Sequence, residues 1–214
     1  MRHVSKLGIV TGILLSAFGA LPVGAGPYLP QVGDELRYGV SNGDVAVTRV
    51  IRTRSQGDRV YAQVVQTLLR QGSEPQTTRF TFIRAEEGLA IQVTPIMEGL
   101  QLSPLVYYLS VPDATESWTA QKGSYRDSAG QEVGYELTAE FLGLETVKVT
   151  AGTFEGCARI AYRSNLAPSS AVRPSEMVFW VKPEIGIVKT RSLQDGRVTE
   201  TELLSFERAT FAHP

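Results

Sequence analysis

Histidine and cysteine are the side chains of this chain best suited to nucleophilic or metal-dependent chemistry, and they are few. The sequence contains His3, Cys157 and His213. A Ser-His-Asp or Cys-His arrangement needs an imidazole held beside its nucleophile, and both histidines lie at chain ends. Zinc sites use several cysteines and histidines at short spacings. The sequence therefore predicts no hydrolase of these classes, no metal site and no cofactor.

Pairs of acidic residues are the remaining candidates for acid–base catalysis of the glycosidase kind. The pairs are Asp34/Glu35, Glu86/Glu87, Asp113/Glu116 and Glu200/Glu202. Neighbouring residues in a strand point to opposite faces, so adjacent carboxylates do not share a substrate. Glu200 and Glu202 share a face, where they are interpreted as solvated charges on an edge strand. We expect a protein that is not an enzyme.

Composition indicates one ordinary globular domain. The chain has 214 residues, of which 43% are hydrophobic and 20% charged, typical of a domain with a sizeable core. Its 21 basic and 22 acidic residues are nearly balanced, whereas nucleic-acid binding requires an excess of bases to neutralise phosphates. Nucleic acid is therefore excluded as a partner.

The first 25 residues resemble an export signal. Arg2 and Lys6 precede an uncharged, mostly apolar stretch over residues 7–21, and Val23 and Ala25 are small residues suited to a signal peptidase. A stretch of about 15 residues is shorter than the roughly 20 of a membrane-spanning helix. We expect cleavage near Ala25, a single mature domain over 26–214 without a transmembrane span, and a periplasmic or extracellular location.

The rest of the chain alternates with a period of two. Val133 to Phe141 gives the most regular alternation, and Asn42-Gly43 is a strong signal for a two-residue hairpin. Strands are predicted over 34–40, 45–53, 59–70, 77–84, 89–96, 133–141, 144–150, 154–163, 176–182, 185–193 and 198–207. Short connections favour pairing of sequential strands. The prediction is an all-β antiparallel meander that forms a barrel or half-barrel.

Two segments depart from this alternation. Residues 99–112 are apolar without a period of two, and Ser103 with Pro104 could begin a short helix near 103–110. Residues 164–175 form a long polar loop rich in proline and serine. The first segment is expected to cover an open end of the barrel, either as a connector packed on the core or as a mobile lid.

Several motifs resemble those of exported bacterial proteins of the DUF3108 and TapB-like type. The stretch Val147-Lys-Val-Thr-Ala-Gly-Thr-Phe154 is similar to their hairpin, and Trp180-Val-Lys-Pro-Glu-Ile-Gly-Ile-Val-Lys189 is similar to the strand pair that follows. Glu202-Leu-Leu-Ser-Phe206 matches their last strand. At the start, Leu36 stands where an aromatic residue is usual. The resemblance implies an envelope β-fold, loosely similar to LolA-like half-barrels, that could hold something apolar, and it supplies no catalytic residues.

The leading functional hypothesis is an apolar, lipid-like ligand held on the concave face of the sheet. The candidate lining residues are apolar or aromatic positions in predicted strands: Phe80, Phe82, Ile91, Val93, Tyr135, Leu137, Phe141, Phe179 and Trp180. The same residues could simply pack a core. The alternative is an assembly module without a small ligand that meets an envelope protein partner through Tyr107, Tyr108 or the loop 164–175.

Cys157 follows a predicted hairpin turn. Free cysteines are usually small buried hydrophobic residues, and a bulge at Gly156 could turn this one inward. An intermolecular disulfide is the alternative in an oxidising compartment.

Overall fold

A computed structural model of the chain describes one antiparallel β-sheet. The described residues are 31–85, 88–93, 101–102, 105–109, 117–126, 130–166, 176–182, 185–194 and 196–209, and no helix occurs among them. The sheet has 13 strands in the order β6-β8-β9-β10-β11-β12-β13-β1-β2-β3-β4-β5-β7. The leader 1–25, and with it the expected cleavage near Ala25, lies outside the described residues.

The strands vary greatly in length. Their bounds are β1 Glu35–Val40, β2 Val45–Gln56, β3 Arg59–Leu69, β4 Gln76–Ala85, β5 Gly88–Val93, β6 Gln101–Leu102, β7 Leu105–Leu109, β8 Ser117–Arg126, β9 Glu132–Val149, β10 Gly152–Leu166, β11 Glu176–Lys182, β12 Gly186–Gln194 and β13 Arg197–Glu207. The longest strands lie inside the sheet, and the two shortest, β6 and β7, lie at its ends.

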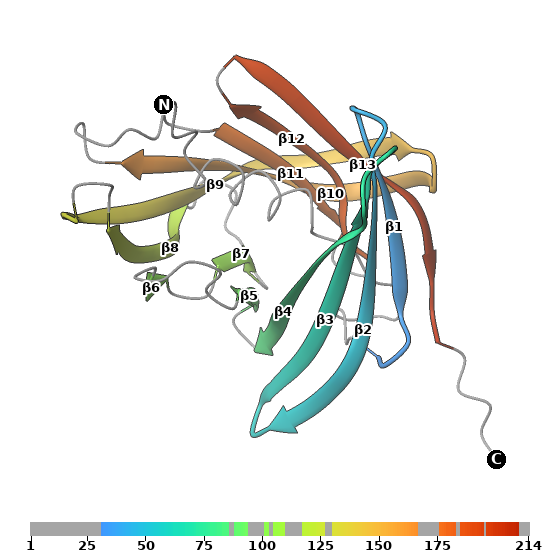
Figure 1. Cartoon of the computed structure of the whole chain (residues 1–214), viewed down its shortest axis with the longest axis horizontal. Coiled ribbons are helices and arrows are strands. Elements are labelled where there is room, and N and C mark those ends of the chain that lie inside the picture. Colours follow the sequence, from blue (N-terminus) through green and yellow to red (C-terminus); the bar gives the residue numbers. More distant parts are fainter. Residues whose placement is uncertain are drawn as a thin grey trace.

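The sheet consists of two meanders, which are joined by the pairing of the first described strand, β1, with the last, β13. Strands β8 to β13 form one meander and β1 to β5 another, and β13 pairs with β1, with Leu36 opposite Phe206. The sheet is therefore interrupted in the middle of the chain, between β6 and β7. In Figure 1 the strands β1–β4 and β9–β12 form two wings that meet at β13.

The sheet curls but remains unclosed. Strand β7 is hydrogen-bonded to β5, and some of its Cα atoms lie within 8 Å of Cα atoms of β8 near the other end of the sheet. No β7–β8 ladder joins the strands that the structure describes. The prediction of an all-β barrel or half-barrel meander is confirmed as an unclosed, barrel-like sheet. We call β5, β6 and β7 the free end.

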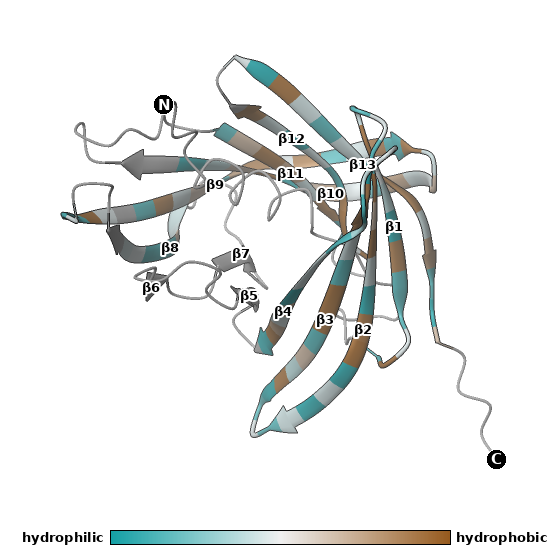
Figure 2. Cartoon of the chain, in the orientation of Figure 1, coloured by the Kyte–Doolittle hydropathy of each residue, from teal (hydrophilic) through white to brown (hydrophobic). Residues whose placement is uncertain are grey.

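Apolar and polar residues alternate along the strands, as the banding of β1–β3 in Figure 2 shows. The buried apolar side chains form two clusters. The first joins β2–β4 to β8–β12 and includes Phe82, Leu137 and Phe179. The second joins β1, β2, β3, β12 and β13 to the tip of the β9–β10 hairpin and includes Tyr38 and Leu203.

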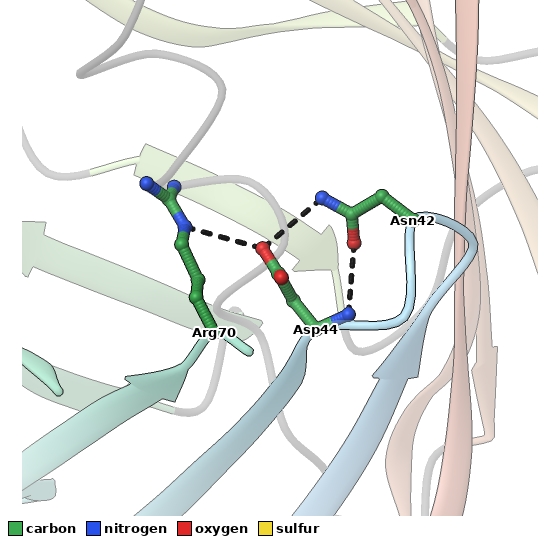
Figure 3. Close-up of polar contacts among 3 residues, drawn as sticks. All are labelled: Asn42, Asp44 and Arg70. Atoms are coloured by element: carbon green, nitrogen blue, oxygen red, sulfur yellow. Dashed lines mark hydrogen bonds and ion pairs between the residues drawn. The ribbon is translucent and has the colours of Figure 1, made fainter. Parts of the chain in front are cut away.

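The Asn42-Gly43 hairpin joins β1 to β2, as predicted. The Gly43 amide donates to the Val40 carbonyl oxygen over 2.8 Å, and Gly43 has φ +89°, a conformation that glycine adopts without strain. Figure 3 shows Asp44 between Asn42 and Arg70. Asp44 Oδ2 accepts from Asn42 Nδ2 over 3.0 Å and from Arg70 Nε over 3.2 Å. These contacts tie the turn to the residue that follows β3.

The first and last described segments of the chain meet in a set of hydrogen bonds that we call the terminal clasp, made by Asp34, Tyr38, Ala151, Leu203 and Ala209. Buried Asp34 accepts from the backbone amides of Gln31 over 2.9 Å and of Ala209 over 3.2 Å. The Ala151 amide, at the tip of the β9–β10 hairpin, donates to the Leu203 carbonyl oxygen over 3.0 Å. Tyr38 Oη donates to the Ile187 carbonyl oxygen over 3.2 Å. The clasp thus joins the segment before β1 to the residues after β13, the long hairpin to β13, and β1 to β12.

The predicted short helix near 103–110 is wrong, because residues 105–109 form strand β7. Its ladder with β5 places Leu109 opposite Gly88 and Leu105 opposite Ile91. Val106 and the two tyrosines that follow it have β-branched and aromatic side chains, which fit a strand that the unpaired edge of β5 can accept. Residues 103–104 and 110 lie outside the described residues.

Two further predictions need correction at strand boundaries. Residues 133–141 and 144–150 belong to one strand, β9, because the irregularity at Leu142 and Gly143 bends the ladder without ending it. Gly143 has φ +123°, which favours glycine there. The polar segment 164–175 begins as strand, since β10 extends to Leu166, and residues 167–175 lie outside the described residues.

Candidate functional site

The candidate site is the inner face of the sheet, where five of the nine predicted lining residues come together. Each of these five is at most 8% exposed and belongs to the first apolar cluster: Phe80, Phe82, Leu137, Phe141 and Phe179. They come from β4, β9 and β11, which are far apart in the sequence. The inner face therefore brings aromatic side chains of both wings into one apolar interior.

Aromatic contacts order this interior. The rings of Phe80 and Phe82 are 5.4 Å apart at 86°, and those of Tyr162 and Phe179 are 4.8 Å apart at 75°. Edge-to-face contacts of this kind stabilise beyond simple area burial. Tyr162 was not among the predicted lining residues, although it has the parity of Ile160 on β10, and that alternation was the available signal.

Three predicted residues are placed by backbone register. Ile91 lies opposite Phe82 and Val93 opposite Phe80 in the β4–β5 ladder, and Tyr135 lies opposite Gly123 in the β8–β9 ladder. The first two thus share the row positions of the inner phenylalanines. The structure describes the backbone of these three residues and not their side chains. Their role as lining residues stays a prediction.

Trp180 lies on the other face of β11 and does not join Phe179, because successive residues of a strand point to opposite sides. Its Nε1 donates to Glu145 Oε2 over 2.7 Å. The Arg159 guanidinium and the Lys189 ammonium lie 5.8 and 5.7 Å from its ring centre, within range of cation–π attraction. Trp180 therefore does not lie beside Phe179, and its partly buried side chain packs against the second cluster.

Glu145 completes this outer cluster. Its carboxylate accepts from Trp180 and also from Arg159 Nη1 over 2.9 Å. The hydrogen bond from Trp180, followed by the hydrogen bond and charge of Arg159, lowers the pKa of Glu145 below its ordinary value of 4.5, although partial burial opposes the shift. These contacts favour the ionised form of Glu145 and connect its side chain to β10 and β11.

Uncharged polar groups separate the two apolar clusters on the inner face. Gln66 Nε2 donates to Thr48 Oγ1 over 3.2 Å, and both side chains are buried. Along β2 and β3 this pair lies between Ala46 and Leu68 of the second cluster and Val50 and Val64 of the first. The interior is therefore apolar on both sides of a satisfied polar contact.

The acidic pairs that the structure describes make local contacts. Glu35 forms an ion pair with Arg49, Glu200 with Lys189 over 3.1 Å, and Glu202 accepts from Thr150 Oγ1 over 2.8 Å. The interpretation of Glu200 and Glu202 as charges on an edge strand is wrong, because β13 lies between β12 and β1. Glu86/Glu87 and Asp113/Glu116 lie outside the described residues.

Cys157 is buried, as the first of its two interpretations predicts. The register shift between Phe154 and Cys157, with Gly156 at φ +66°, turns it into the second cluster, where it is 0% exposed. Its Sγ donates to the Phe154 carbonyl oxygen over 3.3 Å. This burial leaves the thiol no access to a second chain in this conformation.

Among the residues that the structure describes, no group of three or more histidine, cysteine or acidic side chains is placed to hold a metal ion. The same residues contain no helix with the length and apolar character needed to cross a membrane.

Comparison with known proteins identifies a fold and no family. No family model matches the sequence, so the resemblance to the DUF3108 and TapB-like pattern stays a prediction. No curated protein matches it significantly.

Two solved structures are similar in fold. One is a "putative exported protein with YmcC-like fold" from Bacteroides fragilis, with a TM-score of 0.59 and 14% identity. The other is a "putative lipoprotein" from Parabacteroides distasonis, with a TM-score of 0.61 and 13% identity. Each match covers 86% of this chain and 100% of the other. The likeness shows that this fold also occurs in two bacterial proteins.

Proposed function

We propose that the chain is an exported, non-enzymatic envelope protein whose inner sheet face binds an apolar, lipid-like ligand. The leader-like residues 1–25 and the descriptions of the two structural neighbours as exported and as a lipoprotein support the location. The aromatic inner face supports the ligand class, because apolar surface removed from water favours binding by about 25 cal/mol per Å².

One observation carries the proposal, which is that an apolar interior lies inside a sheet whose ends are not joined. Strands β7 and β8 approach each other without a described ladder. They can separate without loss of the backbone pairing that runs from β8 through β13 and β1 to β5. The free end is therefore the entry that this topology offers to an elongated ligand.

Binding must replace contacts within the protein, since Phe80, Phe82, Phe141 and Phe179 are at most 8% exposed. An acyl chain supplies the same kind of contact, and each methylene transferred from water contributes about 0.8 kcal/mol. Several methylenes together offset the cost of separating the free end from β8.

Uptake of a neutral apolar fluorescent probe by the mature chain tests the proposal. We expect a saturable isotherm that salt does not change. Phe82→Asp and Phe141→Asp should abolish it, because each places a charge in the apolar cluster. Thr81→Asp, one residue away on the other face of β4, and Arg52→Gln should leave it intact. Circular dichroism and urea midpoints separate lost binding from lost folding. Absence of saturable uptake by the folded wild-type chain contradicts the proposal.

A second candidate is an assembly module without a small ligand. The observation that favours it is a pair of exposed apolar side chains at the irregularity of β9, Leu142 at 41% and Leu144 at 68%. Native mass spectrometry of the protein from envelope extracts distinguishes the two. A retained lipid supports the ligand, and a stoichiometric protein partner lost in Leu144→Glu supports the module.

A further inference from the structure

Arg84 occupies an inward position on β4. The ladders of β4 with β3 and with β5 show no register shift, so Phe80, Phe82 and Arg84 lie on the same face. Phe80 and Phe82 are buried in the first cluster. Arg84 therefore places a guanidinium at the end of the row that the two phenylalanines begin.

On this face of β2, β3 and β4, the described side chains around Arg84 are apolar or uncharged. Val60 of β3 lies directly opposite it, and Leu89 of β5 lies opposite it in backbone register. The other inward positions of β2, β3 and β4 in the ladder are Ala46, Thr48, Val50, Thr53, Ser55, Val60, Ala62, Val64, Gln66, Leu68, Gln76, Thr78, Phe80 and Phe82. None of these side chains carries a charge to balance Arg84.

The guanidinium is incompletely satisfied. Its Nε is buried and has no hydrogen-bond partner among the contacts of the described residues. Arginine cannot lose its proton in a protein, so the donor cannot be neutralised in place. A buried donor without an acceptor is costly, and each such donor in a native fold calls for an explanation.

We propose that Arg84 binds the carboxylate of a long-chain fatty acid whose tail lies along Phe82 and Phe80. This inference rests on the proposed function, because it names the class of ligand for the same inner face. A planar guanidinium binds a carboxylate through two parallel hydrogen bonds, and one of its N–H groups already lacks a partner. At about 3.3 Å per residue, Arg84 and Phe80 are about 13 Å apart along the strand, which a long acyl tail spans.

The position of Arg84 also fits entry from the free end. In backbone register, the row of Arg84 continues through Leu89 of β5 to Tyr108 of the terminal strand β7, whereas Val93, opposite Phe80, has no partner in β7. A ligand that enters between β7 and β8 with its tail first keeps its head group in a row that reaches the terminal strand. Arg84 lies in such a row, and Phe80 does not.

The test is displacement of the neutral apolar probe from the folded mature chain by palmitate, by cetyl alcohol and by acetate, above pH 7, where the carboxylates are ionised. We expect palmitate to compete at least tenfold more strongly than the alcohol, and acetate not to compete. Arg84→Gln should bring palmitate to the level of the alcohol and leave the alcohol unchanged. Arg84→Lys should keep part of the preference. Arg79→Gln, on the same strand but the opposite face, should change neither ligand.

The outcomes separate the two proposals. If palmitate and alcohol compete equally in the wild type, or Arg84→Gln keeps the preference, the role of Arg84 is wrong although the apolar site stands. If acetate competes as well as palmitate, the site takes a small anion and the fatty-acid assignment is wrong. If the probe itself does not bind, the proposed function fails first. A urea midpoint that is unchanged or raised in Arg84→Gln shows that the variant is folded.

Discussion

The terminal clasp and the free end differ in how the chain holds them. At the clasp, β13 has a ladder on both sides. The Ala151 amide adds a contact from the β9–β10 hairpin, and the Asp34 carboxylate adds one to the residues that follow β13. At the free end, the five-residue strand β7 is paired with β5, and the two-residue strand β6 with β8. One region is fixed by contacts distant in sequence, and the other by short ladders.

This difference shows how local stability can vary within a single sheet. Backbone pairing in the clasp connects segments from the beginning, middle and end of the chain, so local opening there breaks many contacts together. Opening at the free end breaks few, and regions of low local stability are those from which binding elements are drawn. We therefore expect matched substitutions to have different effects in the two regions.

The largest effect is expected from a leucine-to-alanine change in the clasp, compared with the same change closer to the free end. Leu203→Ala in the clasp and Leu137→Ala on β9, two strands from β6, each remove a side chain that is at most 2% exposed. Such changes cost about 2–5 kcal/mol, and the cost is higher where neighbours cannot collapse into the cavity. Urea unfolding should place Leu203→Ala near the upper limit and Leu137→Ala near the lower. The reverse order would refute the comparison.

Removal of the Asp34 carboxylate tests the clasp itself. Asp34→Ala leaves the Gln31 and Ala209 amides without their acceptor, and we expect a loss of about 1–3 kcal/mol in the free energy of unfolding. Asp34→Asn keeps one acceptor oxygen and should lose less. Equal losses in the two variants would mean that side-chain packing, and not hydrogen bonding to the Gln31 and Ala209 amides, accounts for the contribution of Asp34.

A smaller effect is expected where one hydroxyl joins β1 to β12. Tyr38→Phe removes the donor to the Ile187 carbonyl oxygen and keeps the ring in its cluster. The expected loss is about 0.5–1.5 kcal/mol. The control is Tyr61→Phe on β3, a partly exposed position expected within about 0.5 kcal/mol of wild type. Similar losses in both variants would mean that the hydrogen bond from Tyr38 to Ile187 does not contribute to the stability of the clasp.

The smallest effect concerns acid stability. The pKa of Glu145 lies below its ordinary value of 4.5 mainly because Trp180 donates to the carboxylate, so the ionised form stabilises the folded chain above that value. The contribution is lost as pH falls through the lowered pKa. Trp180→Phe should therefore be less stable than wild type near neutral pH, and the difference should shrink below pH 4.5. In a Glu145→Gln background the pH-dependent part should be absent, and its persistence would assign it to another group.

Local patterns in the sequence were sufficient to predict the class of fold. The alternation from Val133 to Phe141 and the Asn42-Gly43 turn predicted β9 and the β1–β2 hairpin because both signals act between near neighbours. The same patterns carry no information on long-range pairing. The contact of β1 with β13 and the extension of β9 past Gly143 depend on segments distant in the sequence, and neither was predicted. Residues 105–109 form a strand because β5 offers them an edge, which a local pattern does not contain.

The candidate site was predictable to the same extent. Parity placed Phe80 and Phe82 on one face, and the same count would have placed Arg84 beside them. It also places Trp180 and Phe179 on opposite faces of β11, although hydrophobicity alone groups the two residues together. Composition identified which residues suit an apolar interior, but only strand geometry decides which of them face it.

The pairing of β1 with β13 has a consequence for the time course of folding. Leu36 lies opposite Phe206, so the first described strand waits until residues about 170 positions later are synthesised before both of its edges are occupied. Contacts between such distant residues slow folding, because the entropy of closing a long loop is lost before the contact forms. Until β13 arrives, one edge of β1 stays open to the edge of another nascent chain.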